Sequence, residues 1–128
     1  RGETLRNDEH NIAVALMTWW ALSCNRFRVP ERSLFAIPNG GARHIGVARK
    51  LKAEGVRAGV SDYFLSVARG GKHGLFLELK AGGNGIKRGR LSREQQDFAV
   101  LVQEMDYAYV TAWGFDEAIK AIEGYLGS

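Results

Sequence analysis

Two charged residues near the middle of the chain have a spacing that suits chemistry on phosphate esters. Glu78 and Lys80 are separated by one residue in the segment 74–80, which reads GLFLELK. Side chains alternate between the two faces of a strand, so the three leucines share one face and Phe76, Glu78 and Lys80 share the other. Charged side chains are rarely buried without a partner or a metal ion. The pattern therefore indicates that Glu78 and Lys80 have a charged partner or a metal ion beside them.

A second strand brings another carboxylate to the same face. The two strands are expected to form a hairpin, and they comprise residues 62–67 and 74–80. A turn centred near Gly71 places Asp62 opposite Lys80. The same register places Phe64 opposite Glu78. Two carboxylates beside an ammonium group suit a hard cation such as Mg²⁺, although a cross-strand salt bridge between Asp62 and Lys80 is the structural alternative.

The composition is that of a globular domain with an uneven charge distribution. The chain has 128 residues and a net charge of +4, with 45% apolar and 25% charged residues, which argues against disorder. Residues 1–93 carry a net charge of +10 and residues 94–128 a net charge of −6. A basic surface is typical of proteins that bind phosphates, although a solvated basic face is also compatible with these numbers. The single cysteine and the absence of a long apolar run favour a cytoplasmic protein that does not enter a membrane.

The hydrophobic periodicity predicts an α/β domain in the order αβαββαβα. Apolar spacing predicts helices at 8–22 and 43–54, a helix after Ser92, and a last helix from Asp116. The stripe of the third helix is expected to consist of Phe98, Leu101, Val102 and Met105. Strands are expected at 34–37, 62–67, 74–80 and 107–112. These elements predict a single domain over 1–128, with its core at about 9–126 and a mixed sheet flanked by helices.

Four ordered blocks of the sequence form a recognisable pattern, namely 37–41 (IPNGG), 51–62 (LKAEGVRAGVSD), 74–80 (GLFLELK) and 91–95 (LSREQ). With these blocks the chain resembles the VRR-NUC family, in its stand-alone phage type, within the PD-(D/E)xK nuclease superfamily. The resemblance covers nearly the whole chain. The proline that precedes the aspartate in the superfamily motif is Ser61 here. The resemblance implies a restriction-endonuclease-like core and a phage-encoded homodimer that cuts DNA.

The resemblance also implies a role for each residue of the site. Asp62 and Glu78 would bind Mg²⁺ or Mn²⁺ together with the backbone carbonyl of Leu79. Lys80 would orient or activate the attacking water. The catalytic set would be completed by Glu9, which reaches the metal directly or through water, and by Gln95.

The sequence leaves alternatives for the two residues that complete the set. Glu9 precedes apolar residues at helical spacing, so it faces inward, but an acid in a first helical turn is also favoured by the helix dipole. Gln95 follows Ser92 by three residues, which is the spacing of a capping box. It also precedes Phe98 by three, so it can face the site.

We expect a set of basic and polar residues to contact the DNA backbone, since phosphates are the main partners of such side chains. The set comprises Asn39, Arg43, His44, Arg49, Arg57, Lys87, Arg88, Arg90 and Arg93. The function expected is metal-dependent endonucleolytic cleavage of DNA, with branched or Holliday-junction DNA as a candidate substrate. The alternatives are a DNA-binding module that keeps the nuclease fold and a nuclease that acts on RNA.

Overall fold

The computed structural model describes residues 2–38, 45–82 and 88–127, with the side chains of residues 2–8 excluded. The described helices are α1 (Gly2–Ser23), α2 (Ile45–Ala53), α3 (Arg93–Glu104) and α4 (Phe115–Leu126), with short 3-10 turns at Cys24–Phe27 and Glu31–Ser33. The described strands are β1 (Leu34–Ala36), β2 (Tyr63–Leu65), β3 (Leu75–Lys80) and β4 (Ala108–Trp113). The predicted order αβαββαβα is confirmed. No helix in these ranges is long and apolar enough to cross a membrane.

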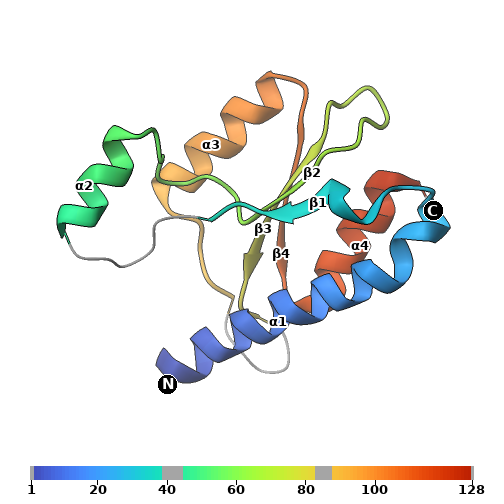
Figure 1. Cartoon of the computed structure of the whole chain (residues 1–128), viewed down its shortest axis with the longest axis horizontal. Helices are drawn as coiled ribbons and strands as arrows, with labels where there is room; N and C mark the ends of the chain where they lie inside the picture. Colours follow the sequence, from blue (N-terminus) through green and yellow to red (C-terminus); the bar gives the residue numbers. More distant parts are fainter. Residues whose placement is uncertain (1, 39–44, 83–87, 128) are drawn as a thin grey trace.

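The four strands form one mixed sheet in the order β1-β2-β3-β4 (Figure 1). The β1/β2 and β2/β3 pairs are antiparallel, whereas β3 and β4 are parallel. Two parallel neighbours need a crossover connection, and the segment that contains α3 supplies it. The predicted mixed sheet flanked by helices is therefore correct.

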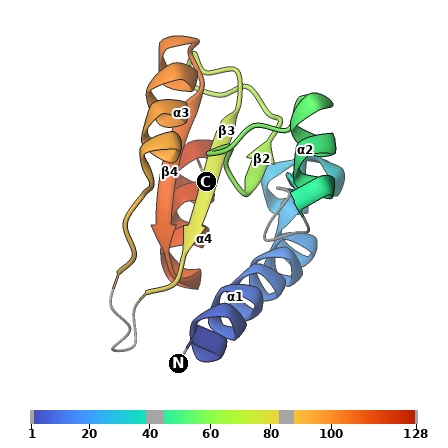
Figure 2. The ribbon, with the colours of Figure 1, turned by 90° about the vertical axis from the view of Figure 1, so that its left-hand side faces the viewer.

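The main hydrophobic core lies between the sheet and the pair α1 and α4. Leu75 and Leu77 of β3 are buried there, as the alternation predicted. Leu16 and Trp20 from α1 and Ile122 from α4 pack against them. Figure 2 shows α3 on the far side of β4 from α4, so the helices cover both faces of the sheet.

The opposite face is covered by α3 through an aromatic contact. Phe98 packs edge-on against Phe76, with ring centroids 5.1 Å apart. Ala99 and Val102 are buried beside it, but Leu101 is 51% exposed and Met105 is 59% exposed. The predicted stripe was thus wrong at these two positions, because the helix turns its 98–99–102 side to the sheet.

The hairpin register differs from the predicted one. Tyr63 pairs with Leu77, and Phe64 pairs with Phe76 rather than with Glu78. One pleat further along, Asp62 therefore lies beside Glu78, and the predicted alignment of Asp62 with Lys80 was wrong.

The turn of the hairpin explains this difference. Arg69 and Lys72 exchange both backbone hydrogen bonds across Gly70 and Gly71, whose φ angles of 57° and 81° are the left-handed values of a type I′ turn. Three residues separate this turn from β2 (66–68), but only two separate it from β3 (73–74). The turn is centred between Gly70 and Gly71 rather than on Gly71, which moves the position opposite Asp62 from Lys80 to Leu79. The extra residue in the first arm acts like a β-bulge and moves it once more, to Glu78.

Candidate active site

Asp62 is fixed at the start of β2 by backbone groups from both neighbouring strands. Its carboxylate Oδ2 accepts a hydrogen bond of 2.8 Å from the Leu79 N–H of β3. Its carbonyl accepts one of 2.7 Å from the N–H of Ile37, which follows β1. The carboxylate therefore has a defined position in the sheet before any ligand binds.

Glu78 is the buried partner of Asp62. Its side chain is 3% exposed, and its Oε2 accepts a hydrogen bond of 3.0 Å from Gln95 Nε2. Its Oε1 is buried and has no hydrogen-bond partner among the described residues. Burial, followed by the charge and the close approach of the Asp62 carboxylate, raises the pKa of Glu78 to about 8, while the charge of Lys80 acts in the opposite direction.

Gln95 performs both of the functions that the sequence left open. Its N–H donates to Ser92 Oγ at 3.1 Å, and its Oε1 accepts from the Ser92 N–H at 2.8 Å, which completes the capping box. The remaining amide nitrogen donates to Glu78. Because the cap fixes the side chain, the amide is held over the carboxylate pair.

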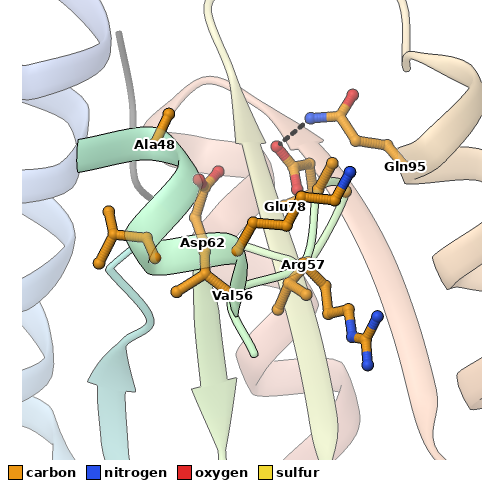
Figure 3. Close-up of a pocket in the computed structure, with 11 residues that line it drawn as sticks. Ala48, Val56, Arg57, Asp62, Glu78 and Gln95 are labelled. Carbon is orange, nitrogen blue, oxygen red and sulfur yellow. Dashed lines mark hydrogen bonds between the residues drawn. The ribbon is translucent and has the colours of Figure 1, made fainter. Parts of the chain in front are cut away.

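A pocket opens beside the two carboxylates, between α2 and the start of α3 (Figure 3). Figure 3 shows Asp62 and Glu78 on neighbouring strands, with Gln95 reaching Glu78 from α3. The remaining wall is mostly apolar and comes from α2 and the loop after it, with Ala48, Leu51, Lys52, Val56, Arg57, Ala58, Gly59 and Val60. No residue of α2 is buried.

Gly59 is the point at which this loop meets α3. Its φ of 88° is a value that favours glycine. A Cβ at this position would collide with the carbonyl oxygen of Glu94 and lie 2.9 Å from the nitrogen of Gln95. The loop that leads to Asp62 therefore approaches the first turn of α3 as closely as a backbone without a side chain allows.

Glu9 lies on the other side of Asp62. It lines a second pocket together with Asp62 and Leu79, and its charge makes a small contribution to the raised pKa of Glu78. Its side chain is exposed, in contrast to the inward position expected from the helical spacing. Within the described part of the chain, no three His, Cys, Asp or Glu side chains are close enough together to hold a metal ion.

Lys80 ends β3 on the same face as Glu78. It is half-buried and pairs with Trp113 in the register of β3 and β4. Its charge reaches Glu78, since it opposes the rise in the pKa of that carboxyl. The sequence thus predicted the common face of these residues correctly.

The residues expected to contact DNA have different surroundings. Arg57 lines the pocket, and Arg49 and Arg90 are exposed. Arg88 forms an ion pair with Glu117 and lies over the ring of Trp113 at 4.9 Å from its centroid. Arg93 pairs with Asp97 at 3.3 Å. Four further candidates lie outside the described residues, namely Asn39, Arg43, His44 and Lys87.

The donor set fits a divalent cation. A buried carboxylate oxygen without a partner, next to a second carboxylate, is unfavourable unless a proton or a cation neutralises it. Carboxylate oxygens are the ligands that Mg²⁺ and Mn²⁺ prefer. Asp62 and Glu78 are therefore the residues that would hold such an ion.

Comparison with known proteins agrees with this arrangement. No family model matches the chain, and no curated protein matches its sequence. The structure is similar to a solved structure named VRR_NUC domain protein, with a TM-score of 0.77 and 26% sequence identity. The match covers 94% of this chain and 88% of that one. The resemblance to the VRR-NUC family and its fold is confirmed.

The substitution Glu78→Gln tests the buried charge. The folded-state pKa of about 8 exceeds the ordinary value of 4.5, so the contribution of Glu78 to stability is complete below pH 4.5 and is lost as the pH rises through 8. The variant lacks this loss. In EDTA, the free energy of unfolding of the variant minus that of the wild type should therefore increase by a few kcal/mol between pH 5 and pH 9. Urea denaturation at both pH values measures the gain. The exposed Glu104→Gln serves as the control, and an equal pH dependence in all three proteins would contradict the prediction.

The substitution Gly59→Ala tests the close approach to α3. Gly55 is a matched control, because its φ is also positive (105°) but a Cβ added to it would meet nothing within 4 Å. Both alanine variants incur the backbone strain, of about 1–3 kcal/mol, and only Gly59→Ala incurs the collision. Calorimetry should therefore show a larger decrease in Tm for Gly59→Ala, and equal decreases would mean that the loop does not press against α3.

Proposed function

We propose that this chain is a metal-dependent nuclease that hydrolyses the phosphodiester bonds of DNA. The observation that carries the proposal is the pair Asp62 and Glu78, held side by side in the sheet, with Lys80 on the same face. The similarity to a VRR_NUC domain protein supports a nuclease-type domain. A pocket with basic residues at its wall gives a phosphate access to the carboxylates.

Each residue of the site has a distinct task in this proposal. Asp62 and Glu78 hold Mg²⁺ or Mn²⁺, with the Leu79 carbonyl as a further ligand and Glu9 acting directly or through water. When bound, the cation lowers the pKa of a water molecule and polarises a phosphoryl oxygen. The Lys80 ammonium orients the attacking water and offsets the negative charge that develops on the phosphate. Gln95 keeps Glu78 in place through Oε2 and leaves Oε1 for the ion.

The substrate is held through its phosphates. Arg49, Arg57 and Arg90 are exposed cations that suit this task, and Lys52 lines the pocket together with Arg57. Arg88 and Arg93 are already paired with acidic side chains, so their contribution requires exchange of those partners. Binding that depends on such contacts decreases steeply as the salt concentration rises.

The described residues contain one such pair of carboxylates. One site cleaves one strand at a time, so coordinated cleavage of two strands requires a homodimer. We propose this assembly together with branched DNA, including four-way junctions, as the substrate. A non-cleaving DNA-binding module is the less favoured alternative, because the complete set of Asp62, Glu78 and Lys80 has no purpose there.

A cleavage assay tests the function. Wild type should cleave plasmid or four-way-junction DNA with Mg²⁺ or Mn²⁺ and lose this activity in EDTA. Asp62→Asn and Lys80→Ala should each lower the cleavage rate by at least about 100-fold, since each removes a group that acts on the reacting atoms. The exposed Asp106→Asn and Lys72→Ala control for the loss of a charge elsewhere.

The outcome separates the candidate functions. Activity that persists in EDTA, or survives both Asp62→Asn and Lys80→Ala, contradicts the proposed site. Binding to DNA without cleavage under any of these conditions favours the binding module. Cleavage of RNA in preference to all DNA substrates favours a ribonuclease with the same site.

A further inference from the structure

Three buried side-chain oxygens around the candidate site lack a hydrogen-bond partner. Among the described residues these atoms are Ser61 Oγ, Glu78 Oε1 and Tyr109 Oη. Ser61 is fully buried, and Glu78 is almost so. An unsatisfied buried polar atom costs about 1–3 kcal/mol, so these three oxygens require an explanation.

The sheet register brings the three residues together. β3 and β4 pair Phe76 with Tyr109 and Glu78 with Thr111, so Tyr109 and Glu78 are diagonal neighbours on one face. Ser61 directly precedes Asp62, which the Leu79 N–H holds beside Glu78.

The electrostatics agree with this proximity. Burial raises the pKa of Tyr109, and the hydroxyls of Thr111 and Ser61 oppose the rise, while the charges of Glu78 and Asp62 add to it. The phenol of Tyr109 therefore lies near the Thr111 and Ser61 hydroxyls and near the carboxylates, although none of these groups lies at the distance and angle of a direct hydrogen bond.

A single water molecule within reach of all three atoms would satisfy them. A buried water typically makes two to four hydrogen bonds to polar groups that otherwise lack partners. It can donate to Glu78 Oε1 and to one hydroxyl oxygen, and accept a hydrogen bond from the other hydroxyl. Because Oε1 has two lone pairs, this water leaves one of them for a metal ion.

We propose that Ser61 and Tyr109 are positioning residues, which hold the Glu78 carboxylate through a buried water molecule that lies between their hydroxyls and Oε1. Gln95 fixes Oε2 from the α3 side, and the water fixes Oε1 from the side of β4. Groups of this kind orient a metal ligand and commonly change metal affinity when they are removed. The proposal gives a function to Ser61, which stands where the superfamily motif has a proline that offers no hydroxyl.

A double-mutant cycle tests the proposal, using calorimetric titration of the full chain with Mn²⁺. Ser61→Ala and Tyr109→Phe should each weaken Mn²⁺ binding about tenfold. The double variant should also bind Mn²⁺ only about tenfold more weakly than the wild type, because both residues act through the same water. Tyr125→Phe is the matched control, since its hydroxyl donates to the Val67 carbonyl at 2.6 Å, outside the site. It should lower Tm and leave the Mn²⁺ affinity unchanged.

Unchanged affinity in both single variants, or effects that multiply in the double variant, overturns the proposal.

A crystal structure of the metal-free protein tests the water separately and should show it within hydrogen-bond distance of Ser61 Oγ, Tyr109 Oη and Glu78 Oε1. Density without this water also overturns the proposal. The titration rests on the proposed metal site, but the crystal structure does not. Absence of Mn²⁺ binding in the wild type therefore counts against the proposed function, while the water is still judged from the crystal structure.

Discussion

The hydrogen bond from the Leu79 N–H to Asp62 Oδ2 joins the two halves of the candidate site. It connects the carboxylate that precedes β2 to the backbone of the residue next to Glu78. Two carboxylates repel each other at close range, so this position has to be imposed by the sheet. The pairing of Tyr63 with Leu77 and the bond from Ile37 to the Asp62 carbonyl impose it. The energy of the folded sheet thus offsets the cost of the charged pair.

A second layer of support comes from α3. Its capping box fixes Gln95, and Gln95 in turn fixes one oxygen of Glu78. The close contact of Gly59 with Glu94 places the same helix turn against the loop that leads to Asp62. The start of α3 and the geometry of the site therefore depend on each other, and a change in either displaces the other.

The sequence was sufficient for those features that depend on local periodicity. Alternation in β3 assigned Glu78 and Lys80 to one face, and helical spacing gave the order of elements. It was insufficient where a feature depends on a long-range fit. The shift of Asp62 from Lys80 to Glu78 has two equal causes, a turn centred between Gly70 and Gly71 rather than on Gly71 and one additional residue in the first arm of the hairpin. The partners of Arg88 and the neighbours of Tyr109 likewise come from elements distant in sequence.

The position of α2 has a consequence for how this fold can change over evolutionary time. None of its residues is buried, and Ile45 is 67% exposed, so substitutions along the helix have little effect on the stability of the domain. The carboxylates, by contrast, are held by strands and by α3 and tolerate little change. One wall of the pocket is thus free to diversify while the reactive groups stay constant. Divergence of substrate preference among relatives should therefore be concentrated in this helix.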